Sequence, residues 1–389
     1  MIGRHQLPVS SPLTVRGLAD GAAAVLRGGE APLTRLTTAL RDRFGASGVV
    51  LTDSGTSALV LALRAAVGRG GTVAYPAYGC VDLAAAAEYV EVRVRLYDLD
   101  PATLSPDLES VDSAIRRGVN AVVVTHLYGF PADVRGVAER ADRAGVMVIE
   151  DAAQGAAGAL GGVTLGAFGP LTVLSFGRGK GMTGGRGGAL LGIGAQGAAM
   201  LNAISLAGTR RRGLGELLTA GAQWALGRPS LYGIPMAIPS LGLGEMVYHP
   251  AYEPRSLATS AAALVRTALT QADAAAARRR QRADALVRCL PAGVKVITSI
   301  SGGTSGMLRM PACITATHPP PPRLGIVPGY PRTLAEQPEL QPLLASGEGE
   351  HPGAATLRRL LHTIPVHDFI TPDDLAALRM WLHACDSNH

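Results

Sequence analysis

Lysine is almost absent from this chain of 389 residues. It occurs only at Lys180 and Lys295, so arginine supplies nearly all of the 36 basic side chains, which face 30 acidic ones for a net charge of +6. No long block of like charge is present, and the short arginine clusters lack interleaved aromatic residues, which argues against nucleic-acid binding. Chemistry that needs a lysine amine can therefore reside at only two positions.

Long apolar runs are also missing. No apolar run free of charge approaches the roughly 20 residues that cross a bilayer, and residues 1–13 lack the apolar core of a secretory signal, so we expect a cytoplasmic protein with no membrane partner. The 4 cysteines are widely spaced, which indicates reduced thiols and not a disulfide framework. His383, Cys385 and His389 stand at the chain end with no fourth partner, so we assign no metal site.

The first half of the chain has the pattern of an α/β sheet. From about residue 48 to 192, short β-branched runs alternate with alanine-rich helical stretches, which predicts a mostly parallel sheet covered by helices. The predicted strands are 48–52, 72–75, 90–98, 121–126, 146–150, 171–176 and 187–192. The predicted helices between them are 55–67, 81–89, 106–116 and 132–144.

The second half has a different character. Beyond residue 195 the pattern weakens, and a strong helical run returns at about 258–288. A proline-rich loop at 318–322 and helices near 353–361 and 372–385 follow. We therefore predict two domains with a boundary near residue 250, a large α/β domain over 1–250 and a smaller α+β domain over 251–389.

Chemically distinctive residues follow several of the predicted strands. Ligands of open parallel sheets bind beyond the carboxyl ends of the strands. Residues 53–57 combine a glycine with hydroxyls at a helix start, which suits a phosphate, although serine and threonine often act there as plain caps. Asp151 follows the strand 146–150; it is either a buried carboxylate that requires a partner or a helix cap.

The glycine-rich loop after the strand 171–176 carries Lys180. Burial there would favour a neutral amine that can attack a carbonyl carbon. Leu174 and Gly181 occupy positions where a P-loop needs glycine and Ser or Thr, so the loop is not a P-loop. Residues 179–184 match the dinucleotide pattern G-x-G-x-x-G, but the acidic residue that should follow is missing, because no Asp or Glu occurs from 152 to 215.

Five motifs stand in a characteristic order and spacing. They are SGTSAL at 54–59, PAYGCVD at 76–82, HLYGFPAD at 126–133, IEDAAQ at 149–154 and SFGRGKGMTGGRGG at 175–188. Together they resemble the DegT/DnrJ/EryC1/StrS family of sugar aminotransferases, which are fold type I enzymes that use pyridoxal 5′-phosphate (PLP). The segment 360–382 is similar to the closing strand and helix of that family.

The resemblance implies roles for the site residues. Lys180 would form the internal aldimine with PLP and later carry a proton, and Asp151 would pair with the pyridinium nitrogen. The other contacts to PLP would come from Gly55, Thr56, Ser57, Tyr78, Gln154 and Ser175. Of these, Gly55 to Ser57 and Ser175 would hold the phosphate, Gln154 would contact the ring, and Tyr78 would stack on it where the family's usual aromatic position holds Cys80.

The resemblance also implies a reaction. An amino donor, with glutamate expected, would pass its amino group to a keto group of a sugar nucleotide or related ketone, at a site completed in a homodimer. Lys180 favours transamination over dehydration, because the dehydratase branch of the family has histidine at that position.

Departures from the family pattern leave alternatives open. The segment that reaches the neighbouring subunit's phosphate has its nearest counterpart at 252–256, and Arg186 replaces a glutamate of the glycine loop. Arg178 and Arg186 either grip an acidic substrate or are solvated. The alternatives are another PLP reaction on the same scaffold, such as that of a cyclase, lyase or racemase, or an inactive PLP-binding homologue.

Overall fold

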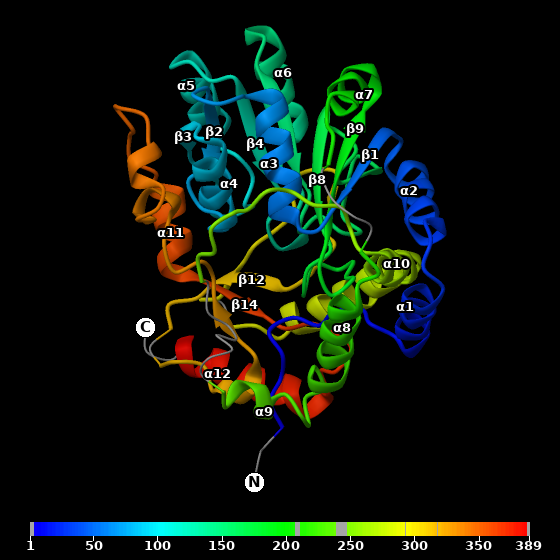
Figure 1. Cartoon of the computed structure of the whole chain (residues 1–389). Helices are drawn as coiled ribbons and strands as arrows, with labels where there is room; N and C mark the ends of the chain where they lie inside the picture. The colour runs from blue at the N-terminus through cyan, green and yellow to red at the C-terminus, as the bar shows by residue number, and fades with distance from the viewer. Residues whose placement is uncertain (1–3, 207–210, 239–246, 292, 317, 387–389) are drawn as a thin grey trace.

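A seven-stranded sheet forms the centre of the molecule (Figure 1). The computed structural model describes residues 4–206, 211–238, 247–291, 293–316 and 318–386. The sheet has the order β1-β9-β8-β5-β4-β2-β3. Its strands are β1 (Ala46–Thr52), β2 (Thr72–Pro76), β3 (Arg93–Tyr97), β4 (Ala121–Thr125), β5 (Met147–Asp151), β8 (Leu171–Ser175) and β9 (Gly188–Ile193). β2, β3, β4, β5 and β8 pair in parallel, and β9 runs antiparallel to β8 and β1. The predicted α/β fold class with a mostly parallel sheet is confirmed.

Helices fill the connections between the strands. They are α3 (Gly55–Ala66), α4 (Asp82–Val90), α5 (Leu108–Arg116) and α6 (Val134–Ala144), with the short η1 (Leu127–Gly129) after β4, and α7 (Gly194–Asn202) follows the last strand, β9. The strand predicted at 90–98 begins only at Arg93, because α4 runs on to Val90 and ends where Glu91 takes a left-handed conformation with φ 58°. Two N-terminal helices that the sequence analysis did not assign, α1 (Val15–Arg27) and α2 (Ala31–Phe44), precede the sheet.

A second, smaller sheet lies in the C-terminal part, in the order β10-β12-β14-β13. Its strands are β10 (Lys295–Val296), β12 (Met310–Cys313), β13 (Val327–Pro328) and β14 (Leu361–Ile364). The predicted C-terminal helices correspond to α11 (Pro352–Leu360) and α12 (Pro372–Asp386). The remaining elements are β6 (Ala159–Leu160), β7 (Val163–Thr164), β11 (Gly303–Thr304), α8 (Leu214–Leu226), α9 (Gly233–Met236), η3 (Pro322–Leu324), η4 (Leu334–Glu336) and η5 (Gln341–Leu343).

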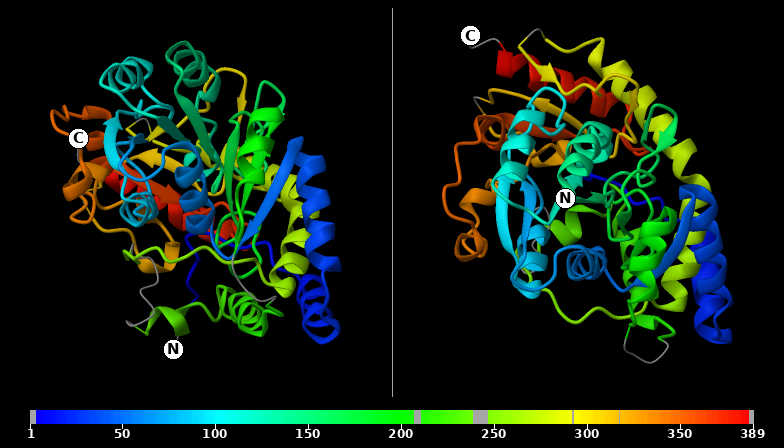
Figure 2. Two further views of the ribbon diagram at one scale, coloured as in Figure 1. Left: turned by 45° about the horizontal axis from the view of Figure 1, so that its top comes forward. Right: turned by 90° about the horizontal axis from the view of Figure 1, so that it is seen from above.

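The long helix α10 (Thr259–Val287) joins the two parts of the molecule. Its first turns pack beside Phe176 in one core, and Leu286 near its end packs beside Trp381 in another. Figure 2 shows α10 passing alongside α1 and α2. The domain boundary near residue 250 stays a prediction. No helix within the described ranges combines the length and apolar character that a membrane crossing requires.

Candidate active site

Polar groups gather at the N-terminus of α3. Ser54 is the N-cap residue, and its Oγ accepts a hydrogen bond from the Ser57 amide at 2.9 Å. The Ser57 hydroxyl donates to Asp53 at 2.7 Å. A Cβ placed on Gly55 would lie 2.7 Å from Cβ of Ser175, so the end of β8 faces this first turn closely. First-turn amides and a facing hydroxyl are the groups that bind a phosphate.

Asp151 ends β5 close to this site. The side chain is buried, accepts a hydrogen bond from the Ala153 amide at 3.0 Å and lies 3.5 Å from the Thr125 hydroxyl. Burial raises the pKa of Asp151, while the Ala153 amide and the charge of Lys180 counteract part of that rise. No ion pair of Asp151 occurs within the described residues. A cation bound beside this buried carboxylate would stabilise its charged form.

The loop between β8 and β9 presents Lys180. Gly179 and Gly181 flank it with φ of 74° and 79°, a conformation that glycine adopts without steric cost. The loop closes on itself through the Gly184 amide, which donates to the Phe176 carbonyl at 3.0 Å. Lys180 is half-buried and lines a cavity, whereas Lys295 is exposed on β10. Of the two lysines, Lys180 is the one placed for chemistry.

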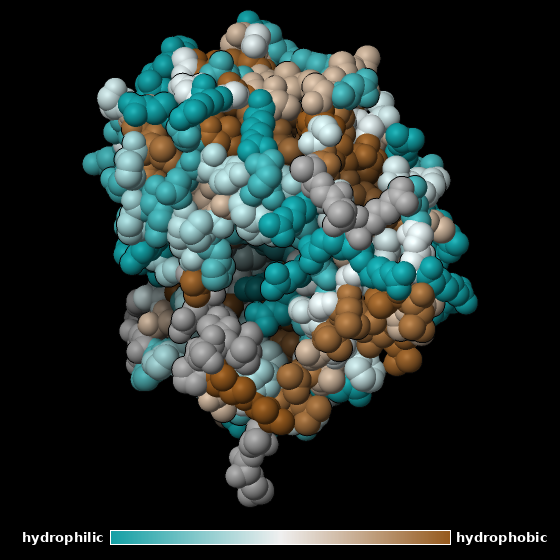
Figure 3. Space-filling view, in the orientation of Figure 1, coloured by the Kyte–Doolittle hydropathy of each residue, from teal (hydrophilic) through white to brown (hydrophobic). Residues whose placement is uncertain are grey.

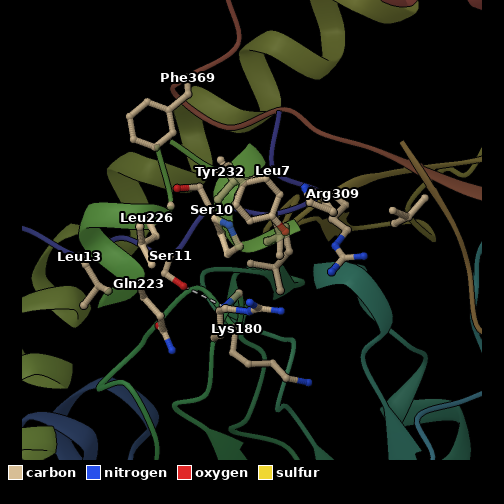
Figure 4. Close-up of a pocket in the computed structure, with 18 of the residues that line it drawn as sticks. Leu7, Ser10, Ser11, Leu13, Lys180, Gln223, Leu226, Tyr232, Arg309 and Phe369 are labelled. Atoms are coloured by element: carbon tan, nitrogen blue, oxygen red, sulfur yellow. Dashed lines mark hydrogen bonds between the residues drawn. The ribbon is translucent and has the colours of Figure 1, made fainter. Parts of the chain in front are cut away.

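The cavity has a volume of about 1160 Å³ and opens between the sheet and the C-terminal part (Figure 3). Its walls come from the glycine loop, α8, the segment after β13 and N-terminal residues 7–13 (Figure 4). Gln154 is held at one wall: its Nε2 donates to the Tyr330 hydroxyl at 2.8 Å, and its Oε1 accepts from the Tyr128 amide at 3.1 Å. The rings of Tyr128 and Tyr330 stack at 5.8 Å.

Tyr78 lies behind this wall. It is fully buried, its ring centroid is 5.1 Å from that of Tyr330, and its hydroxyl accepts a hydrogen bond from the Tyr330 amide at 2.7 Å. It is not among the described residues that line the cavity, whereas Tyr128 and Tyr330 are. Stacking of Tyr78 on the cofactor ring stays a prediction.

Tyr128 and Tyr330 were not identified from the sequence. Tyr128 lies three residues after the end of β4, so the rule that singled out Asp151 could also have found it. Tyr330 follows the short strand β13 in the C-terminal part, and nothing in its local sequence relates it to the large sheet.

A buried pair fixes the back of the site. His126 Nε2 lies 2.8 Å from Glu150, and His126 Nδ1 accepts a hydrogen bond from the Ala132 amide at 3.0 Å, so Nε2 carries the proton. Although burial raises it, the pKa of Glu150 is held below its ordinary value by His126 and by amides that include those of Gly166 and Gly169. Both side chains are fully satisfied and act as structural supports for the loops beyond β4 and β5.

The departures from the family pattern have defined places. Cys80 lines the cavity, and burial raises the pKa of its thiol to about 12. The segment 252–256 lies beside the start of α3 in the same chain, because the Asp53 amide donates to the Arg255 carbonyl at 2.9 Å. Arg178 lines the cavity, while Arg186 is not among its described lining residues.

Several proteins of known name are similar to this chain over part of its length. The L-glutamine:2-deoxy-scyllo-inosose aminotransferase of Streptomyces kanamyceticus is 35% identical over 155 residues, which are 37% of this chain and 36% of that protein. The UDP-N-acetyl-3-dehydro-alpha-D-glucosamine 3-aminotransferase of Acidithiobacillus ferrooxidans is 36% identical over 115 residues, 29% and 31% of the two chains. The chain thus matches about a third of the length of these relatives.

Solved structures match over nearly the whole chain and show the same fold. The aminotransferase TlmJ from Streptoalloteichus hindustanus has a TM-score of 0.76 at 22% identity and covers 99% of both chains. The GDP-4-keto-6-deoxy-D-mannose-3-dehydratase of E. coli with bound hydrated PLP has a TM-score of 0.76 at 16% identity and covers 98% of this chain and 100% of that one. The sequence model of one family matches residues 23–304. This chain therefore belongs to the DegT/DnrJ/EryC1/StrS aminotransferase family, as its five motifs predicted.

Proposed function

We propose that this protein is a PLP-dependent aminotransferase that moves an amino group from an amino acid to the keto group of a sugar nucleotide or a related small ketone. The observation that carries this proposal is the position of Lys180. The lysine lines the cavity from a glycine loop whose preceding strand ends beside the first turn of α3. Its charge also acts on Asp151, at the end of the neighbouring strand β5.

The residues present fit PLP. The first turn of α3 and the hydroxyl of Ser175 suit its phosphate. Asp151 is a buried carboxylate without an ion pair in the described structure, and a protonated ring nitrogen would supply the positive charge that burial makes necessary. When bound, PLP supplies an electron-withdrawing ring that delocalises the charge left when the Cα proton is removed.

Each protein group then has a defined task. Lys180 would hold the cofactor through its amine, and the same amine would carry the proton that leaves the substrate Cα. Asp151 would hold the ring nitrogen and keep it protonated. Gln154, fixed between Tyr128 and Tyr330, orients the ring, and the cavity walls limit access of water to the reacting carbon.

The names of the relatives support a cyclic keto acceptor. One is named for 2-deoxy-scyllo-inosose and another for a dehydro sugar linked to UDP. Glutamate is the expected donor, although one of these relatives is named for glutamine. Lysine at position 180 supports transamination in preference to the dehydration named for one structural neighbour.

The proposal is tested by covalent trapping. After incubation with PLP and reduction with borohydride, mass spectrometry should locate a pyridoxyl group on Lys180 and none on Lys295. Lys180→Ala should abolish the adduct, and Lys295→Ala, a matched change on the exposed strand β10, should retain it. An adduct confined to Lys295, or none at all, contradicts the proposal.

A labelled donor separates transamination from the other PLP reactions. With glutamate that carries ¹⁵N in its amino group, an aminotransferase moves the label into the acceptor. A cyclase, lyase or racemase leaves the label on the donor or releases it. The acceptor panel should start with keto sugars linked to nucleotides and with keto cyclitols.

A further inference from the structure

The charges on the cavity wall are all of one sign. The charged side chains that line it are Lys180, Arg178, Arg228 and Arg309, and none of its described lining residues is acidic. Like charges that share a partly desolvated space repel one another, and they gain stability when an anion joins them. The cavity is therefore built for a negatively charged ligand.

Arg309 stands out among these side chains. It is half-buried near Tyr128, Tyr330 and Tyr232, and burial lowers its pKa, with the charge of Arg178 lowering it further. Its side chain donates to the Thr363 hydroxyl at 3.4 Å, and no carboxylate pairs with it within the described residues. Arg228 differs, because its guanidinium already rests on the Trp224 ring at 4.4 Å.

The backbone that carries Arg309 is tied down. The Leu308 amide donates to the Tyr128 carbonyl at 3.0 Å, and the Gly306 amide donates to the Gly129 carbonyl at 2.8 Å. From α10, Arg279 donates to the carbonyls of Gly306 and Met307 at 2.8 Å each. These bonds fix residues 306–308 against the loop after β4, so the guanidinium of Arg309 is held in position before any ligand arrives.

Arg309 and the reactive amine face the same space. In Figure 4 the guanidinium of Arg309 and the amine of Lys180 point toward the same side of the cavity. Arg178 precedes Lys180 by two residues on the glycine loop and lines the same cavity. The proposed function assigns the cofactor's phosphate to the first turn of α3, so these two arginines remain for another anion.

We propose that Arg309 and Arg178 form an anion subsite beside Lys180 that takes a carboxylate or phosphate group of a substrate. The planar fork of a guanidinium matches both of these groups. The inference rests on the proposed function, because it assigns the subsite to a substrate of that reaction. It adds the residues that bind the negative group of that substrate, Arg309 and Arg178.

The test is a binding measurement that needs no turnover. The protein, saturated with PLP, is titrated by calorimetry with glutarate and separately with inorganic pyrophosphate. Glutarate presents carboxylates without an amino group, so it does not react with the cofactor. Arg309→Gln and Arg178→Gln should each weaken binding of one probe by about 10- to 100-fold. Arg309→Lys should retain part of the affinity, because it keeps the charge and loses the fork.

A control variant tests whether the loss of affinity is specific, and a second variant covers the case in which Arg309→Gln does not fold. Arg143→Gln makes the same change on an exposed position of α6 and should leave both affinities unchanged. Arg178 is exposed, so its variant still tests the subsite if Arg309→Gln fails to fold.

The two probes separate the sources of the anion. Loss confined to glutarate assigns the subsite to the carboxylate of the amino donor, and loss confined to pyrophosphate assigns it to a phosphate of the acceptor. Unchanged affinity for both probes in both arginine variants overturns the proposal, as does failure of both probes to bind the unmodified protein. A missing adduct on Lys180 together with arginine-dependent probe binding would defeat the proposed function and leave the subsite standing.

Discussion

Gly55 shows how much can depend on a missing side chain. It begins α3, and any Cβ there would lie 2.7 Å from Cβ and 2.9 Å from Oγ of Ser175. The two residues thus approach each other as closely as their backbones allow, and the proposed phosphate site lies where they meet. A methyl group would push Ser175 away from the first turn of the helix.

We expect Gly55→Ala to weaken PLP binding by about tenfold or more, since overpacking of a tight contact costs about 1–3 kcal/mol. Fluorescence titration of the protein with PLP measures this. Gly215→Ala on α8 is the matched control, because a Cβ there meets nothing within 4 Å. Equal affinities of the two variants would show that the contact with Ser175 does not shape the phosphate site.

The residues that sequence analysis identified are those with a local signal. Lysine is rare in this chain and Lys180 is surrounded by glycine, and Asp151 ends a strongly apolar strand. Tyr330 and Arg309 have no such signal. They reach the cavity only because the small sheet packs against the large one, and that contact joins parts of the chain far apart in sequence.

At the scale of elements, the N-terminal segment 7–11 is hydrogen-bonded both to the glycine loop and to the C-terminal part of the chain. The Gly179 amide donates to the Ser11 hydroxyl at 3.0 Å, and His367 Nε2 donates to the Leu7 carbonyl at 2.9 Å. The Phe369 amide donates to His367 Nδ1 at 3.3 Å, so the imidazole is neutral with both nitrogens used.

The buried His367 makes the free energy of unfolding depend on pH. Burial lowers the pKa of His367 from its ordinary 6.5 to about 4, although the bond to Leu7 opposes the shift. Between these values the unfolded chain binds more protons, so the stabilisation is full above about pH 6.5 and is lost as pH falls toward about 4. The loss from about pH 7.5 to about pH 5 should be roughly 2 kcal/mol from this group.

Urea unfolding at the two pH values, with His367→Gln as comparison, checks this. Glutamine can still donate to Leu7 but does not titrate, so the variant should lose less stability on acidification. If the free energy of unfolding depended on pH identically in both proteins, His367 would not be the cause of the pH dependence.

Arg279 on α10 carries a second prediction at this scale. The side chain is buried, and its donors satisfy two carbonyls of the segment before β12. Burial lowers its pKa to about 10. Arg279→Met leaves those carbonyls without partners and should destabilise the fold by about 2–4 kcal/mol.

Its neighbour provides the control for thermal or urea unfolding. Arg278 pairs with Asp368 at 2.9 Å on the surface, where both side chains are 49% exposed. Arg278→Met should therefore cost less than about 1 kcal/mol. Similar losses in the two variants would contradict the assigned role of Arg279.

For the whole molecule, an apolar surface supports the proposed homodimer. Leu214 and Leu218 on α8 are 58% and 65% exposed, and Leu26 on the adjacent α1 is 80% exposed. Figure 3 shows hydrophobic residues gathered over the α8 region. Contiguous exposed apolar surface of this kind marks an interaction site.

We expect the protein to be a dimer and Leu218→Glu to shift it toward monomer, because a buried charge opposes the contact. Light scattering coupled to size-exclusion chromatography gives the mass. Met380→Glu, at a 74% exposed position on α12, is the matched control. A dimer that survives Leu218→Glu would place the interface elsewhere.

The sheet was predictable from the sequence because its order rests on local apolar periodicity. The seven strands of the large sheet and the helices α3 to α6 follow the alternation seen along the chain. The order of the small sheet was not predictable, since its strands are short and pair with strands far away in the sequence. β10, for example, has only 2 residues, and its partner β12 lies beyond a loop.

The 29-residue helix α10 has a practical consequence for anyone who wishes to divide the protein. A fragment that ends before α10 lacks the start of this helix, which packs in the same core as Phe176. A fragment that begins after α10 lacks the end of this helix, which packs in the same core as Trp381. Each fragment would therefore have an incomplete hydrophobic core. Melting of this protein should accordingly register as one event, with the catalytic loop and the C-terminal sheet lost together.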